Sequence, residues 1–446
     1  MISKFIYRIV FFLALLNLSL SQAQINPSAN FIGVDVSTSP QNVSFNYDSC
    51  FTLGANLGMK RVGVFQNWTS IETSSHVFNM TLFDIANYYY PAYNMPIDLT
   101  IAPIATNHLE VPSDLTTTAF DDPAFINRFE ILLDSVKLHI PNITLASLVI
   151  GSEHDIYLGT NATLWVRYTT FYNSVSAYAK TLWPGLKVAT ELTFTGITTQ
   201  PTFTQTLNTN SDYIGVSYYP LNNDFTVKPV SVIPTDFATL VGLYPSKPLC
   251  FYQYGYPSGT SCNSSETQQA QFISQTFTSW DAYATNIKMI DFTWLHDLDT
   301  AVVNYYGSYY GITDTVFLEY LHTLGLRTWN GSGTDKPAFL ELECQAKQHG
   351  YNNLNVVCST KIDELINEND LINIYPNPNS GKFNLTINNF NNTQLNIYNV
   401  LGECVYKHSN TFADEQIELH DQPNGIYFIT IKIDQGIVSK KMIINK

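Results

Sequence analysis

The strongest constraint on the fold is an alternation of apolar runs and amphipathic stretches between residues 31 and 345. Eight runs have the length and the β-branched and aromatic content of strands. They cover residues 31–36, 61–65, 97–103, 145–151, 187–194, 213–219, 248–253 and 288–294. Helical patterns lie between many of them, and the clearest cover residues 123–139, 165–182 and 265–284.

Eight strands that alternate with helices over about 300 residues predict an α/β fold, a (β/α)8 TIM barrel, for residues 24–345. The alternative is an open, doubly wound parallel sheet. The sequence has no glycine-rich phosphate loop after the first strand, which argues against nucleotide binding. In a barrel of this type, functional side chains lie at the C-terminal ends of the strands.

The composition narrows the class of partner. The chain of 446 residues is 45% hydrophobic and only 13% charged, so it can bury a large core. Its formal net charge is −15 and it has no long basic run, which argues against nucleic acid and anionic membranes as partners. Aromatic residues make up 14% of the chain, which suits either sugar stacking or β-rich packing. No cysteine or histidine cluster indicates a metal, and no motif indicates a cofactor.

The N-terminal residues 1–23 have the pattern of a secretory signal peptide. Lys4 and Arg8 precede an apolar stretch at 9–20, and Ser21-Gln22-Ala23 provides a cleavage site. No later segment is apolar enough for a transmembrane span. Export permits disulfides among the six cysteines. Pairs such as 250 with 262 and 344 with 358 would close short loops, but spacing alone does not fix the connectivity.

The C-terminal part of the chain changes character. Residues 346–370 are predicted to be a linker, and their second half is charged and lacks an apolar face. From residue 371 to 446 the pattern is that of short alternating strands, at 382–387, 394–398, 403–407, 416–419, 425–433 and 437–444. Asn, Asp, Pro and Gly separate these strands, as in a small all-β, Ig-like sandwich.

Several motifs of this C-terminal segment occur in a characteristic order. They are IYPNP at 374–378, GKF at 381–383, IYNVLG at 397–402, PNGIY at 423–427 and KKMII at 440–444. Together they resemble the C-terminal sorting domain of type IX secretion substrates. The resemblance implies the type IX secretion machinery as a partner and a secreted or cell-surface attached protein. A terminal carbohydrate-binding or adhesive sandwich is the alternative.

The barrel segment carries a second resemblance. Its fourth strand ends in LVIGSEHD at 148–155. Four further motifs occur in the order found in one enzyme clan, and they are WTSIE at 68–72, DYIGVSYYP at 212–220, GLR at 325–327 and KPA at 336–338. These motifs resemble the glycoside-hydrolase clan of (β/α)8 barrels that carries catalytic glutamates on strands four and seven. The resemblance implies that Glu153 is the general acid/base. It also implies a substrate-binding set made of Trp68, Tyr218, Tyr219, Trp294, His296 and Asp297.

The sequence departs from that pattern at two positions. Ser152 stands where the clan usually has Asn, and Gln253 stands where the clan has its nucleophilic Glu. An amide cannot form the glycosyl ester of a retaining enzyme. Glu191 is the best replacement carboxylate, as a base for water, although pairing with Arg61 inside the barrel is an equal alternative. Lesser candidates are Asp35, Asp155 and Asp297.

Three functions are therefore open. The first is a secreted glycoside hydrolase that acts on a polysaccharide or oligosaccharide. The second is a catalytically degenerate barrel that binds carbohydrate. The third is an exported structural or adhesive surface protein.

Overall fold

The computed structural model describes residues 24–36, 46–356, 358, 372–387, 394–400, 403–409, 414–433 and 436–446. The chain divides into two compact units between residues 358 and 359. The predicted signal peptide at 1–23 lies outside the described residues, and so does most of the predicted linker.

The first unit contains the eight predicted parallel strands. They are β1 (Phe31–Val34), β2 (Val62–Asn67), β5 (Ile97–Ala105), β7 (Leu145–Ser152), the pair β8 (Lys187–Ala189) and β9 (Glu191–Thr193), β10 (Ile214–Tyr218), β11 (Leu249–Tyr254) and β12 (Ile287–Phe292). One sheet has the order β1-β12-β11-β10-β9 and the other the order β2-β5-β7-β8. Only Thr190 separates β8 from β9, and β1 lies beside β2. The barrel prediction is confirmed, and the doubly wound alternative is wrong.

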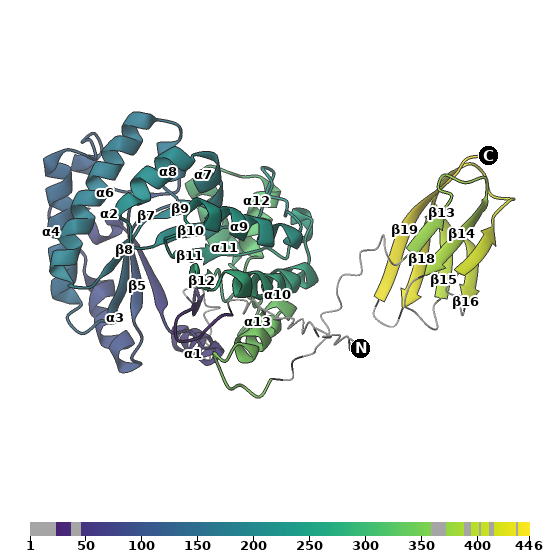
Figure 1. The fold of residues 1–446 in the computed structure, drawn as a ribbon, viewed down its shortest axis with the longest axis horizontal. Helices are drawn as coiled ribbons and strands as arrows, with labels where there is room; N and C mark the ends of the chain where they lie inside the picture. The colour runs from purple at the N-terminus through teal and green to yellow at the C-terminus, as the bar shows by residue number, and fades with distance from the viewer. Residues whose placement is uncertain are drawn as a thin grey trace, which may run out of the picture. The chain divides into compact units, whose positions relative to one another are not determined.

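Helices pack around the strands (Figure 1). They include α1 (Tyr47–Leu57), α3 (Thr81–Ala92), α4 (Pro123–His139), α6 (Ala162–Leu182), α8 (Pro201–Leu207), α9 (Ile233–Leu243), α10 (Glu266–Tyr283) and α13 (Pro337–Gln348). The bounds of α4 coincide with the predicted helix because its start is well specified. Asp122 caps it by accepting a hydrogen bond from the backbone N–H of Ala124 at 2.8 Å, and Pro123 occupies the first helical position.

The predicted end of the barrel, at residue 345, falls inside α13. A disulfide joins Cys344 of this helix to Cys358, with 5.3 Å between the Cα atoms. The other short pairing does not form, since Cys250 and Cys262 are both unbridged and buried. No helix among the described residues is long and apolar enough to cross a membrane.

Further elements lie in the loops that follow the strands. Helix α2 (Trp68–Ile71) and the short strands β3 (Glu72–Ser74) and β4 (Val77–Phe78) follow β2, and β6 (His108–Leu109) pairs back on β5. Short helices α5 (Asp155–Leu158) and α7 (Phe194–Thr199) follow β7 and β9. Two longer helices, α11 (Thr300–Tyr310) and α12 (Thr315–His322), follow β12. All these loops follow the C-terminal ends of barrel strands, which is the end of the barrel at which a site is expected.

The second unit is the predicted small all-β domain. Its strands are β13 (Ile372–Tyr375), β14 (Lys382–Ile387), β15 (Gln394–Asn399), β16 (Cys404–Ser409), β17 (Asp414–Glu418), β18 (Gly425–Ile433) and β19 (Gly436–Ile444). They form two antiparallel sheets with the orders β13-β14-β17 and β16-β15-β18-β19. The core between them is apolar and includes Phe383, Leu395 and Ile429. The alternation of apolar and polar residues in the sequence therefore identified this domain correctly.

Candidate functional site

Glu153 follows the last residue of β7 and has a backbone φ of +50°, which is uncommon for a residue with a side chain. Its backbone N–H donates to the carbonyl oxygen of Glu191 at 3.0 Å. Its carboxylate accepts one hydrogen bond on each oxygen. Thr106, which follows β5, donates to Oε2 at 2.7 Å, and Ser217 of β10 donates to Oε1. These hydroxyls hold a half-buried carboxylate in one orientation at the end of the barrel.

Glu191 lies directly beside Glu153, at the start of β9. Its Oε2 atom accepts hydrogen bonds from the Ser152 hydroxyl at 2.7 Å and from the Gln253 amide at 3.3 Å. The residue is only 2% exposed, and its Oε1 atom has no hydrogen-bond partner. Burial, and then the charge of Glu153, raise the pKa of Glu191 to about 8. Both effects favour the neutral, protonated form of Glu191 over its carboxylate.

Gln253 near the end of β11 completes this group. Its Nε2 atom donates to the Ser152 hydroxyl at 3.2 Å and to Glu191, while its Oε1 atom accepts from the Tyr219 hydroxyl at 3.1 Å. Both ends of the amide are therefore engaged. The structure brings Glu153, Glu191 and Gln253 together at one end of the barrel, from three strands that are distant in the sequence.

The alternative partner proposed for Glu191 is wrong. Arg61 forms its ion pair with Asp98, at 3.6 Å, and its guanidinium lies 4.0 Å from the centre of the Phe31 ring. Asp98 also accepts a hydrogen bond from Ser147 at 2.5 Å. The cation is thus engaged by a carboxylate of β5 and not by Glu191.

The lesser candidate Asp155 has a structural role in this geometry. It is buried and accepts hydrogen bonds from the backbone N–H of Thr193 at 2.9 Å and from the Thr193 hydroxyl at 2.6 Å. Burial raises its pKa to about 7. A Cβ atom at Gly196 would lie 2.1 Å from its Oδ2 atom, so the turn into α7 needs glycine there. Asp35, which follows β1, is half-buried and its backbone N–H donates to Phe292 of β12.

Two of the six predicted substrate-binding residues are core residues. Trp68 is fully buried, packs edge-on against Phe125 and Phe129, and donates from Nε1 to Glu72 at 2.9 Å. Tyr218 is also fully buried and donates to Asp236 at 2.7 Å. Neighbouring strand residues face opposite sides, so the inward position of Ser217 sends Tyr218 outward to the helices. For these two residues the sugar-contact prediction is wrong.

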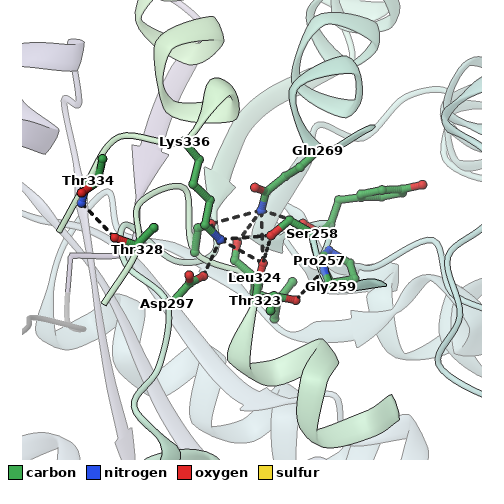
Figure 2. Close-up of polar contacts among 12 residues, drawn as sticks. Pro257, Ser258, Gly259, Gln269, Asp297, Thr323, Leu324, Thr328, Thr334 and Lys336 are labelled. Atoms are coloured by element: carbon green, nitrogen blue, oxygen red, sulfur yellow. Dashed lines mark hydrogen bonds and ion pairs between the residues drawn. The ribbon is translucent and has the colours of Figure 1, made fainter. Parts of the chain in front are cut away.

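His296 and Asp297 belong to a second polar group, at the segment that closes the barrel. Figure 2 shows the contacts of Asp297 and Lys336 in this group. Lys336 donates to Asp297 at 2.6 Å, to the carbonyl of Gly325 at 2.8 Å and to the Ser258 hydroxyl at 3.1 Å. His296 is fully buried, with its Nε2 atom 3.1 Å from Nη1 of Arg327. The structure gives both side chains a structural role, because they tie the end of the barrel together, and their role as substrate contacts stays a prediction.

Tyr219 and Trp294 are half-buried near Gln253 and α11. Tyr219 reaches Gln253 through its hydroxyl, and Trp294 stacks on Tyr306 of α11 with 6.5 Å between ring centres. The predictions missed Thr106 and Ser217. The inward alternation on the sixth strand indicates Ser217, but no local signal indicates Thr106. No group of three or more potential metal ligands occurs in the described part of the chain.

Comparison with known proteins agrees with both units. Residues 373–445 match the family model described as secretion system C-terminal sorting domain. The second unit is therefore a type IX sorting domain, which indicates secretion or cell-surface attachment. The comparison with curated protein sequences gives no significant match.

Solved structures with a similar fold include glycoside hydrolases. An exo-β-1,4-mannosidase from Opitutaceae bacterium strain TAV5 has a TM-score of 0.56 and 13% identity, over 74% of this chain and 62% of that enzyme. The chain thus spans less than two thirds of that mannosidase. A GH5_18 protein from Bifidobacterium longum subsp. longum, solved with Manβ1-4GlcNAc, has a TM-score of 0.55 and 13% identity, over 72% of this chain and 78% of that protein. At this identity the likeness establishes the barrel fold alone.

Proposed function

We propose that the barrel binds a carbohydrate beside Glu153 and that it lacks the two-carboxylate hydrolysis of the glycoside-hydrolase clan that its sequence resembles. The observation that carries this proposal is the engagement of Gln253 at the end of β11. Its amide donates to Glu191 and Ser152 and accepts from Tyr219, so a neutral group is built into this position by three partners.

The chemistry of retaining hydrolysis supports this reading. A carboxylate nucleophile about 5 Å from the acid must attack the sugar and form an ester, which an amide does not do. Glu191 does not replace it, because its carboxyl is only 2% exposed and its raised pKa disfavours the charged form that would have to face a sugar. Glu153 remains as a half-buried carboxylate that can accept hydrogen bonds from sugar hydroxyls.

The neighbouring side chains fit a sugar ligand. Tyr219, which contacts Gln253, and Trp294, which stacks on Tyr306 of α11, are half-buried aromatic residues, and such rings stack on the apolar faces of sugars. The sorting domain at 373–445 indicates secretion or cell-surface attachment of the barrel. The predicted signal peptide would act in the first step of this export. The ligand class is therefore an extracellular glycan. Manβ1-4GlcNAc, found in a structural neighbour, is the first probe.

Hydrolysis by Glu153 and Glu191 is the second candidate. The two carboxyls lie on adjacent strands in opposite environments, one half-buried between two hydroxyls and one buried with a pKa raised to about 8. Such a split separates a proton donor from a charged group in several enzymes. In this reading Glu191 would donate the proton.

Glycan binding tests the proposal directly. The full chain is applied to a glycan array that contains Manβ1-4GlcNAc, together with Glu153→Gln and, as control, the exposed Glu266→Gln. We expect binding without cleavage, a loss of about tenfold or more in Glu153→Gln because a charged hydrogen-bond acceptor is lost, and no change in the control. Absence of any glycan binding would overturn the proposal.

An exchange of two residues tests the missing nucleophile. Gln253→Glu alone would place a second carboxylate next to Glu191, whereas Gln253→Glu with Glu191→Gln keeps one amide and one carboxyl in the pair. We expect cleavage of the bound glycan by the double variant and none by the wild type. Cleavage by the wild type that is lost in Glu191→Gln would establish the second candidate instead.

A further inference from the structure

Helix α11 reaches from the loop after β12 to the hairpin that follows β5. The His108 ring stacks on Tyr309 with 4.1 Å between ring centres, and its Nε2 atom lies 2.6 Å from the Tyr309 carbonyl oxygen. The Tyr309 hydroxyl donates to Glu110 at 2.7 Å, and Thr69 donates to the other oxygen of Glu110. We call His108, Glu110 and Tyr309 the latch.

The following helix, α12, is fixed to loops on other strands. Phe317 packs against Phe225 with 4.8 Å between ring centres, and Tyr320 meets Tyr219 edge-on at 5.7 Å. Helix α12 also lies close to the loop after β11, because a Cβ atom at Gly259 would stand 2.4 Å from Cγ of Glu319. The two helices are thus held at the loops after the third, sixth and seventh barrel strands.

The fixed helix runs close to Glu153. Tyr310 follows the latch residue Tyr309, and its hydroxyl has a pKa raised by burial and then by the charge of Glu153. Thr106 donates to Glu153 at 2.7 Å. It is the first residue of the turn that joins β5 to β6, the short strand that carries His108. Tyr306 of the same helix stacks on Trp294, which follows β12.

We propose that α11, joined to β12 at its N-terminal end, held by the latch at its C-terminal end and packed against α12, is a strap across the barrel mouth that limits the site to a chain end or a short oligosaccharide. A polymer could reach Glu153 through an internal segment only by threading beneath a helix fixed on both sides. Releasing the latch requires the loss of two hydrogen bonds and one ring stack. The nature of the ligand rests on the proposed function, whereas the size limit does not.

Size-graded labelling tests the strap without any sugar. Thr106→Cys is introduced into the full chain together with Cys404→Ser, which removes the exposed cysteine. The rates of N-ethylmaleimide and of a maleimide on a polyethylene glycol chain are compared, each divided by its rate at Cys404 of the wild type. Latch variants are Tyr309→Ala and His108→Ala. The control is Tyr88→Ala, an 86% exposed tyrosine on α3.

With the latch intact, we expect the large reagent to react at least about tenfold more slowly than the small one, because it must wait for local opening. The latch variants should bring the two normalised rates together, and the control should not. Equal rates with the latch intact would overturn the proposal, as would an unchanged ratio in the latch variants. If N-ethylmaleimide also fails to react, the mouth admits no sugar and the proposal falls.

Two additions keep the outcome interpretable. Tyr309→Phe keeps the ring stack and removes only the hydrogen bond to Glu110, so it replaces Tyr309→Ala if that variant does not fold. We expect an intermediate ratio of the two labelling rates in Tyr309→Phe. An unchanged ratio in both Tyr309→Phe and His108→Ala would contradict the latch. A failure of the glycan array leaves these rates unaffected, so failure of the proposed function and failure of the strap are distinguishable.

Discussion

Two buried carboxyl groups, Glu191 beside the candidate acid and Asp297 at the closing segment, have opposite surroundings. Asp297 accepts from the ammonium group of Lys336 at 2.6 Å, and the same ammonium group also donates to backbone carbonyls. Glu191 meets only a hydroxyl and an amide among its hydrogen-bond partners, and one of its oxygens has none. Burial raises the pKa of both groups, to about 6 for Asp297, where Lys336 opposes the shift, and to about 8 for Glu191.

This difference separates a structural group from a candidate functional one. A buried charge that is paired and hydrogen-bonded holds two segments together, and its loss leaves the partner uncompensated. A buried carboxyl without a cation contributes to stability only while it is protonated. Polar residues at the ends of barrel strands therefore have two distinct roles in this protein, and their charge partners tell the roles apart.

The largest expected effect is at the closing segment. Lys336→Met removes the cation and leaves Asp297 buried, so it should lower the free energy of unfolding by about 3–5 kcal/mol. Lys382→Met is the matched control, because its pair with Glu418 is about half exposed and should change stability by less than about 1 kcal/mol. Urea denaturation measures both, and similar losses in the two variants would contradict the comparison.

The second expected effect depends on pH. The pKa of Glu191 rises from 4.5 to about 8 on folding, so below 4.5 both states are protonated and its contribution is complete. Between these values the unfolded chain ionises while the folded protein stays protonated, so wild-type stability falls by up to about 1.4 kcal/mol per pH unit. Glu191→Gln should lack this component. Parallel stability curves for wild type and variant across that window would refute the assignment.

The smallest expected effect separates two adjacent tyrosines. Tyr218→Phe removes a hydroxyl that donates to Asp236, on the helix side of β10, and should cost about 1 kcal/mol of stability without changing glycan affinity. Tyr219→Phe removes the hydroxyl that holds Gln253 and should weaken glycan binding with less effect on stability. Thermal denaturation and glycan titration check the two variants together, and the reverse pattern would contradict the placement of these side chains.

The sequence predicted the fold well because the fold depends on repeated local signals. Eight apolar runs separated by amphipathic stretches are enough to specify a closed parallel barrel, and alternation with turn residues specifies the second unit. The predicted end at residue 345 falls inside α13, which continues to Gln348; Lys347 in its last turn and Gly350, with φ +77°, are the local signals that mark its true end.

The site was predicted in part. Motif order located Glu153 and Gln253, alternation on the fifth strand located Glu191, and the structure brings these three together. Motif order also selected Trp68, His296 and Asp297, which are buried against helices or at the closing segment, because a motif does not show which way a side chain points. The contacts between α11 and the hairpin after β5 join residues about 200 positions apart, such as His108 and Tyr309, and local patterns carry no information about such pairs.

The most direct test of the central claim is a crystal structure of the full chain with the glycan that binds best on the array. We predict an intact glycan at the barrel mouth, with a sugar oxygen within about 2.6–3.2 Å of the Glu153 carboxylate and with Gln253 still bonded to Glu191. A cleaved glycan, or a glycan bound only away from Glu153, would contradict the claim that this barrel holds a carbohydrate without hydrolysing it.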